Sequence, residues 1–351
     1  MFCLKIILMF TIGLIITATT AYASILNPDG HFELPVIGAT GWAARAAGEP
    51  LRTAPNNRAT TIQTLPHGTG FTVLREVGEF WYVRLGGGDV TGYVRNRYAF
   101  INLPDIILSM EYTITNATAS MMRTHGQEIE GITGQVLYSA SAFNHRLERY
   151  EYIVPILYAT AHRLMAAQTA ALADGNTIIM YEAFRPFATQ VHVYNSITRA
   201  QRSLFSCAWS FGWFLSTPRP NSLPVYANTR PERISNHQRG IAVDVGLRRI
   251  DGDVFVMPTE IHELSAAARV TRSPRQNAVT QRAETFTASE GAVLLQSYMM
   301  SAGFSPLISE WWHFDDFGSR TRILGGATTV INGNFFTPTI YSEPISGSLV
   351  E

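Results

Sequence analysis

The sequence has no excess of charge of either sign and almost no cysteine. Its 27 basic and 27 acidic side chains give a formal net charge of +0, so no polyanion such as a nucleic acid is expected as a partner. Of the 2 cysteines, Cys3 lies in an N-terminal segment that we expect to be removed. Cys207 is then the only thiol, which excludes an internal disulfide and leaves packing to stabilise the fold.

Lysine is absent after Lys5, so every later basic side chain is an arginine. Compositional drift is the interpretation that we favour. The alternative is that a chain without ammonium acceptors avoids ubiquitination inside a host cell.

No apolar run is long enough to indicate a membrane-spanning helix. The first residues have instead the pattern of an export signal: a cation at Lys5, an apolar run over residues 6–16 and a small-x-small pattern ending at Ala23. We therefore expect residues 1–23 to be a signal peptide. The mature protein is expected to be periplasmic or extracellular, with no membrane anchor after signal cleavage.

Length and composition indicate an ordered protein of two domains. The chain has 351 residues, of which 46% are hydrophobic and 15% charged, and this excludes a disordered chain. Residues 41–103 have the pattern of a small all-β barrel, and residues 105–325 mix helical and strand periodicities. The fold class that we predict is therefore α+β. The tail, residues 326–351, is rich in Gly, Thr, Pro and Ser and is expected to be irregular.

The sequence of the first domain consists of short runs of alternating apolar and polar residues, separated by glycine-rich turns. Strands are expected near residues 69–73, 81–85 and 92–94. The motifs Leu51-Arg52-x-Ala54-Pro55, Leu65-Pro66-x-Gly68-Thr69 and Gly92-Tyr93-Val94 resemble the bacterial SH3-like domain of cell-wall enzymes. That resemblance implies docking onto peptidoglycan or orientation of an enzyme, and a purely structural cap is the alternative.

The second domain carries apolar positions at the spacing of helices and strands. Residues 149–173 are predicted to be a helix that Gly175 ends. The other expected elements are a strand over 177–181, a helix over 187–199, a strand through Ile241, Val243 and Val245, and a helix over 289–302.

Two distant motifs supply candidate metal ligands. One is Ser235-Asn236-His237-Gln238-Arg239-Gly240-Ile241-Ala242-Val243-Asp244, and the other is Glu310-Trp311-Trp312-His313. The spacing of His237 and Asp244 is too long for one helical face but suits a loop that enters a strand, with Gly240 permitting the turn. Two imidazoles and one carboxylate form a set that a catalytic zinc ion uses, with the fourth position left to water.

Glu310 lies three residues before His313 and is the candidate general base. A carboxylate within hydrogen-bond reach of zinc-activated water takes its proton as the water attacks a carbonyl carbon. The alternative is that Glu310 is an ordinary surface acid and that Trp311 and Trp312 only pack the core.

Arg185 follows the strand expected over 177–181 and precedes Pro186. A guanidinium in a dry pocket stabilises the negative charge of a tetrahedral intermediate. An Arg-Pro pair after a strand is by itself more often structural.

These motifs together resemble the zinc D-alanyl-D-alanine dipeptidases and the wider group of D,D-carboxypeptidases. The resemblance rests on Ser235-x-His237-x-x-Gly240-x-Ala242-x-Asp244, Glu310-Trp311-Trp312-His313 and Phe184-Arg185-Pro186, in that family's order, and extends over residues 112–314. It implies a central antiparallel sheet, a Zn²⁺ ion on His237, Asp244 and His313, Glu310 as base, and Arg185 at the scissile carbonyl or its oxyanion.

One segment departs from the dipeptidase pattern. The resemblance implies an acidic residue that holds the free amino group of the substrate, within Met-Gly-x-x-Phe-Asp. This chain has Met257-Pro258-Thr259-Glu260-Ile261-His262-Glu263, with His262 in place of the aspartate. Glu260 and Glu263 are the alternatives, and without a carboxylate there a longer acylated peptide is accommodated.

We therefore predict an exported zinc peptidase that cuts D-Ala-D-Ala in the free dipeptide or in peptidoglycan stems. The first alternative is a D,D-carboxypeptidase or endopeptidase on intact peptidoglycan, with cell-wall binding through the SH3-like domain. The second is a non-catalytic wall-binding zinc protein, against which all five catalytic positions argue.

Overall fold

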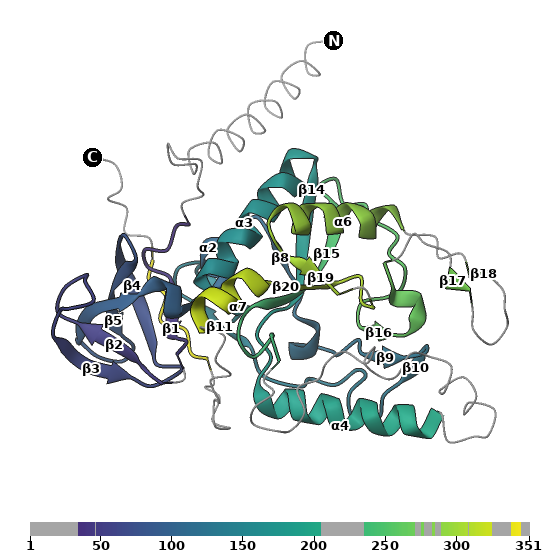
Figure 1. Ribbon diagram of the computed structural model, residues 1–351, viewed down its shortest axis with the longest axis horizontal. Coiled ribbons are helices and arrows are strands. Elements are labelled where there is room, and N and C mark those ends of the chain that lie inside the picture. The colour runs from purple at the N-terminus through teal and green to yellow at the C-terminus, as the bar shows by residue number, and fades with distance from the viewer. Residues whose placement is uncertain are drawn as a thin grey trace, which may run out of the picture. The chain divides into compact units, whose positions relative to one another are not determined.

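The computed structural model describes residues 34–45, 47–204, 235–270, 275–276, 283–284, 289–307, 309–324 and 338–344 (Figure 1). The expected signal peptide and Cys207 lie outside these residues. Residues 36–351 belong to one compact unit, which contains every element discussed below. Within the described ranges, no helix combines the length and the apolar character that crossing a bilayer requires.

The N-terminal part is the expected antiparallel β-structure. The sheet order is β13-β7-β1-β4-β5-β6-β2-β3. Side chains that alternate along β5, Trp81 and Val83 among them, are buried in its core together with Phe71 on β4. The strands are β1 (Thr40–Ala43), β2 (Glu49–Arg52), β3 (Thr61–Leu65), β4 (Gly70–Val77), β5 (Phe80–Leu85), β6 (Thr91–Arg95), β7 (Ala99–Asn102) and β13 (Pro155–Leu157).

The second part is built on a five-stranded sheet of order β19-β20-β15-β14-β8. Its pairs are antiparallel except for β14 with the edge strand β8, which run parallel. The strands are β8 (Glu111–Tyr112), β14 (Asn176–Glu182), β15 (Ala242–Arg249), β19 (Ser305–Pro306) and β20 (His313–Asp315). The fold is therefore α+β, as the sequence predicts.

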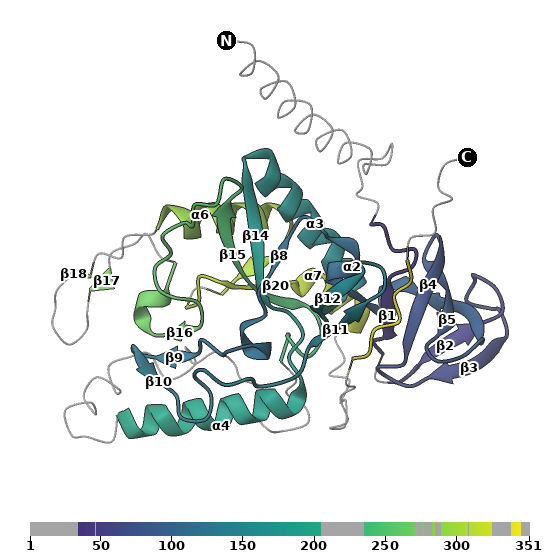
Figure 2. The ribbon, with the colours of Figure 1, turned by 180° about the vertical axis from the view of Figure 1, so that it is seen from behind.

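Helices α3 (Tyr158–Ala173) and α6 (Glu290–Ser301) lie side by side and contact β14 and β15 (Figures 1 and 2). α6 begins where the sequence predicts, because the Ser289 hydroxyl caps it by accepting from the Ala292 amide at 3.2 Å. The remaining elements are α2 (Leu103–Ile106), α4 (Phe187–Leu204), α7 (Phe317–Leu324), β9 (Arg123–Thr124), β10 (Gln127–Glu128), β11 (Ser141–Asn144), β12 (Arg149–Tyr152), β16 (Glu263–Leu264), β17 (Arg275–Gln276) and β18 (Ala283–Glu284).

The predicted start of the helix over 149–173 is wrong. Residues 149–152 form β12, which pairs with β11, and residues 155–157 form β13, which pairs with β7. Pro155 explains the boundary, because proline disfavours the helical conformation of the residue before it and supplies no amide hydrogen. The helix therefore begins only at Tyr158.

Asp105 connects elements that are distant in the sequence. One carboxylate oxygen accepts the Thr40 amide at 2.9 Å, and the other accepts the Asn144 side-chain amide at 2.5 Å. The residue is fully buried, and this desolvation raises the pKa of the carboxyl group despite the hydrogen bonds.

Replacing Asp105 with Ala is expected to lower the free energy of unfolding by about 1–3 kcal/mol, because two buried donors lose their acceptor. The contribution of Asp105 is expected to be fully present below the unfolded pKa of about 3.9 and to fall as the pH rises through the raised folded pKa, since burial penalises the charged form. Urea unfolding of wild type and D105A between pH 3.5 and 7 measures both effects. A difference that grows with pH would contradict this assignment.

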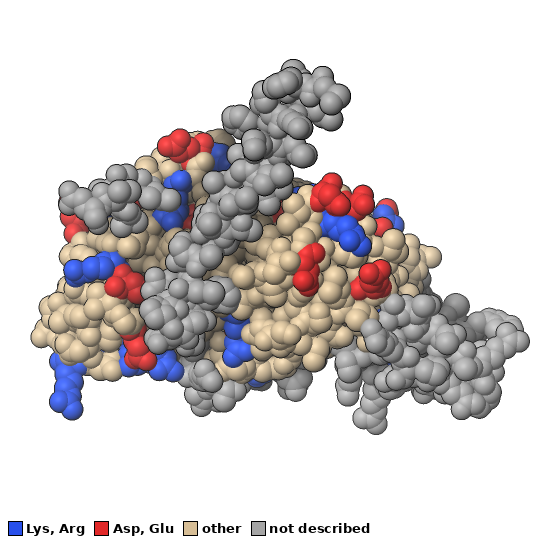
Figure 3. Space-filling view, turned by 90° about the horizontal axis from the view of Figure 1, so that it is seen from above, with Lys and Arg blue, Asp and Glu red and all other residues tan. Residues whose placement is uncertain are grey.

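Charges of both signs are interspersed on the face drawn in Figure 3, and the described part of that face shows no basic patch. This distribution agrees with the balanced composition of the chain.

Candidate metal centre

The sheet register places the candidate ligands in one row. Asp244 on β15 is directly opposite His313 on β20 and also pairs with Glu182 on β14. Residues opposite each other on neighbouring strands have side chains within contact distance. His237 joins them from the turn before β15, where Gly240 adopts a φ of +63° and a Cβ would lie 2.7 Å from the Phe100 ring.

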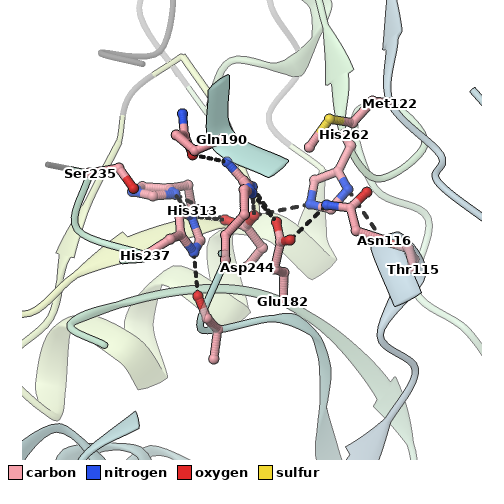
Figure 4. Close-up of polar contacts among 12 residues, drawn as sticks. Thr115, Asn116, Met122, Glu182, Gln190, Ser235, His237, Asp244, His262 and His313 are labelled. Atoms are coloured by element: carbon pink, nitrogen blue, oxygen red, sulfur yellow. Dashed lines mark hydrogen bonds and ion pairs between the residues drawn. The ribbon is translucent and has the colours of Figure 1, made fainter. Parts of the chain in front are cut away.

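Three atoms of these side chains lie close together (Figure 4). His313 Nδ1 is 2.9 Å from Asp244 Oδ1, and His237 Nε2 is 3.2 Å from His313 Nδ1 and 3.5 Å from Asp244 Oδ1. Each of the three residues can turn one ligand atom towards a common point. The structure thus brings the three predicted metal ligands together.

Each imidazole has its other nitrogen held by an oxygen acceptor. His237 Nδ1 lies 2.7 Å from the carbonyl oxygen of Ala183, and His313 Nε2 lies 3.2 Å from Asp315 Oδ1. Asn236 in turn donates to Asp315 Oδ1 at 2.9 Å. Such partners fix the tautomer and the orientation of a metal-ligating histidine, which leaves His237 Nε2 and His313 Nδ1 for an ion.

The second oxygen of Asp244 is also engaged. His262 Nε2 lies 3.0 Å from Asp244 Oδ2, and the Arg185 guanidinium lies 3.6 Å from the same atom. His262 is buried, has a φ of +61° and packs its ring edge-on against Trp312. The histidine at the position where the resemblance implies an aspartate therefore contacts a candidate metal ligand.

Arg185 lies beside the ligands and is held by two other side chains. Its guanidinium donates to Glu182 Oε2, at 2.9 Å from Nε, and to Gln190 Oε1 at 3.0 Å. Glu182 Oε1 accepts from the Asn116 side chain at 2.7 Å. These contacts fix the guanidinium next to Asp244.

Glu310 is buried at the same site, with only 6% of its surface exposed. Its Oε1 atom has no hydrogen-bond partner among the described residues. Desolvation raises the pKa of this carboxyl group to about 7, and the neighbouring His313 opposes that rise. An unpartnered buried carboxylate costs free energy, so a proton donor such as a bound water is expected to complete the site.

The charges of Asp244 and His313 depend on each other. Burial raises the pKa of Asp244, but the charge of His237 and hydrogen bonds from the histidines outweigh it and hold that pKa well below its usual value. Burial lowers the pKa of His313, but hydrogen bonds to Asp244 and Asp315 outweigh it and hold that pKa well above its usual value. An ion therefore competes with a proton on His313, and its binding is expected to release protons.

The donor set fits a zinc ion. Two imidazole nitrogens and one carboxylate oxygen, with acceptors behind both rings and a free acid alongside, are the ligands of a catalytic zinc site. A second group, Glu182, Asp244 and His262, also lies within ligating reach. Arg185 lies between its two carboxylates, so a guanidinium already occupies the side of Glu182 and Asp244 that this second group would turn to an ion.

Sequence reasoning assigned no role to Asp315, Asn236, Glu182 or Gln190. The contact of Asp315 with His313 could have been predicted, because residues i and i+2 of a strand project from the same face and Asp315 follows His313 by two positions. Gln190, which accepts from Arg185, and Asn116, which donates to Glu182, had no such signal, because neither residue stands in a recognisable motif.

The fold and the site define a β-barrel joined to an α+β domain whose sheet carries a buried two-histidine, one-aspartate centre. Residues 212–324 match the D-ala-D-ala dipeptidase family, and residues 45–99 match the bacterial SH3 domain. The resemblance drawn from the motifs is thus confirmed for both parts of the chain.

One curated relative is the D-alanyl-D-alanine dipeptidase of Escherichia coli (strain K12), to which the chain is 34% identical over 84 residues. That stretch is 23% of this chain and spans 37% of the relative's length. Among solved structures, the LdcB LD-carboxypeptidase, reported with the molecular basis of its peptidoglycan recognition, is 14% identical with a TM-score of 0.25, covering 61% of this chain and 95% of the other.

Proposed function

We propose that this chain is an exported zinc metallopeptidase that hydrolyses the D-Ala-D-Ala bond of a dipeptide or of a peptidoglycan stem peptide. One observation carries the proposal: ligand atoms of His237, Asp244 and His313 lie within 3.5 Å of one another, beside the buried Glu310, whose Oε1 atom has no hydrogen-bond partner among the described residues. The matches to the D-ala-D-ala dipeptidase family and to the bacterial SH3 domain support it.

In the proposed mechanism, the metal ion and the side chains of the protein have separate roles. A bound zinc ion supplies a Lewis acid and lowers the pKa of water to about 7. Glu310, which is buried beside the ligands, accepts the proton of the attacking water and delivers it to the leaving amine. Arg185, held by Glu182 and Gln190, stabilises the negative charge that develops on the carbonyl oxygen.

A second candidate is cleavage of longer peptides that lack a free amino group near the bond, as a carboxypeptidase or endopeptidase. The presence of His262 favours this candidate. Its Nε2 atom contacts Asp244, and the side chain supplies no negative charge to a substrate ammonium group. Glu263, one of the two alternative acids, accepts the Gly126 amide at 3.0 Å with Oε1, and Glu260 is exposed.

One mass-spectrometry experiment distinguishes the two candidates. The purified protein is incubated with free D-Ala-D-Ala and with a pentapeptide muropeptide, each with and without a zinc chelator. Chelator-sensitive release of D-Ala is expected. Cleavage of the muropeptide alone would select the second candidate, and turnover that a chelator does not affect would exclude the metal mechanism.

The contact of His262 with Asp244 gives a separate prediction. Replacing His262 with Ala is expected to weaken zinc affinity by about 10–100-fold, because the non-ligating oxygen of Asp244 loses a partner that orients it. Competition with a chromophoric chelator measures the affinity. His192→Ala is the control, because the His192 ring is exposed and its hydrogen bond within the described residues is to the Gly131 carbonyl, which is not part of the metal centre. Equal affinities of H262A and wild type would remove His262 from the site.

A further inference from the structure

A short C-terminal segment, residues 338–344, lies along the barrel beside β1 and β4 (Figures 1 and 2). The Tyr341 amide donates to Thr40 Oγ1 at 2.9 Å, and the Thr72 hydroxyl donates to the Tyr341 carbonyl at 2.6 Å. Two residues on, the Glu343 amide donates to the Gly38 carbonyl at 2.9 Å. The segment has no regular secondary structure, yet three of its backbone groups are paired with the barrel.

The ring of Tyr341 fills a slot between two glycines. A Cβ atom on Gly70 would lie 2.2 Å from one edge of the ring, and a Cβ atom on Gly86 would lie 2.2 Å from the other. Neither glycine has a positive φ, so the backbone conformation does not require glycine at either position. The space that the ring occupies does require it, since any side chain there would expel Tyr341.

The residues around Tyr341 add specific contacts. The Ser342 hydroxyl donates to Asn144 Oδ1 at 2.8 Å and is buried, and Glu343 forms an ion pair with Arg84 on β5. Ile340 packs against an apolar cluster of the core. An open cavity of ≈ 300 Å³ continues past the ring, lined among others by Arg84, His145 and Pro344.

We propose that this Gly70–Gly86 slot is a peptide-recognition site of the barrel, selective for an extended segment with an aromatic ring followed two residues later by a carboxylate. Residues 338–344 are its resident ligand. The two glycines leave space for the aromatic ring. Thr40, Thr72 and Gly38 form hydrogen bonds with the peptide backbone, and Arg84 forms an ion pair with the carboxylate. A peptide of the same pattern competes with the resident segment for the slot. This site is separate from the metal centre, so the proposal does not rest on the proposed activity.

The test uses the full chain with Tyr341→Ala, which vacates the slot, and a fluorescein-labelled peptide with the sequence of residues 338–344. Saturable binding to Y341A is expected, and at least about tenfold weaker binding to wild type, because a tethered segment competes at millimolar effective concentration. Gly86→Ala added to Y341A is expected to abolish binding. Gly88→Ala is the matched control in the same turn, since a Cβ there meets nothing within 4 Å. A folded Y341A chain that does not bind the peptide overturns the proposal.

Hydrogen exchange on the wild-type chain tests the same site without any substitution. The amides of Tyr341 and Glu343 are expected to exchange at least about tenfold more slowly than free-peptide rates, since both are donors to the barrel. Exchange at free-peptide rates would show that residues 338–344 do not occupy the slot, and would overturn the proposal even if Y341A does not fold.

Discussion

Replacing Glu310 with Gln is expected to lower kcat by about 10²–10⁴-fold while the protein retains zinc. Gln has the shape of Glu but takes no proton from water, so only the proton transfer is removed. Zinc affinity is expected to change far less than kcat, because Glu310 is not among the three proposed ligands His237, Asp244 and His313. Single-turnover kinetics and elemental analysis of the same sample measure both quantities.

Glu130→Gln is the matched control, because Glu130 is an exposed acid and its substitution removes the same charge from the chain. Unchanged turnover in E310Q would exclude Glu310 as the base. Loss of zinc together with loss of turnover would instead make Glu310 a ligand or a structural acid.

Replacing His313 with Ala is expected to abolish the stabilisation that zinc confers. A ligand that binds only the folded state adds about 2.7 kcal/mol at 100 times its Kd. Wild type should show this increase in the free energy of unfolding when zinc is added, and H313A should show none. The comparison is made within each protein, with and without zinc. It is therefore independent of the hydrogen bonds to Asp244 and Asp315 that H313A also loses.

Urea unfolding in matched zinc concentrations gives these values, with His192→Ala as the control that keeps the metal centre. An equal zinc-induced increase in H313A and wild type would place the ion elsewhere in the chain.

Local sequence patterns predicted much of the fold. The strands of the barrel and the strand over 177–181 were predictable because a few neighbouring residues form each apolar pattern. Ser289 likewise marks the start of α6. The predicted helix start at residue 149 is wrong, because apolar spacing alone does not show that Pro155 and its neighbours pair with β7. That pairing depends on contacts across more than fifty residues of sequence.

The candidate site was predictable only in its motif residues. His237, Asp244, Glu310 and His313 stand in two recognisable motifs, and the register between β15 and β20 then places Asp244 opposite His313. Of the groups that orient them, Asp315 lies two positions after His313, whereas the Ala183 carbonyl and His262 come from elsewhere in the chain. His262, whose φ is +61°, contacts Asp244, and no sequence spacing indicates that contact.

The bacterial SH3 match over residues 45–99 supports our proposal that the barrel docks onto the cell wall. The Gly70–Gly86 slot bears on wall docking, because residues 338–344 occupy it. The slot becomes accessible to an external peptide only after that segment leaves. The two expectations are compatible if wall binding uses another face.

Zinc K-edge X-ray absorption of the zinc-loaded protein tests the central claim most directly. The site built from His237, Asp244 and His313 predicts one zinc per chain with about four nitrogen or oxygen neighbours at about 2.0–2.2 Å and the multiple-scattering signature of two imidazoles. A sulfur neighbour at about 2.3 Å, a single imidazole, or protein that stays free of metal in excess zinc would contradict it.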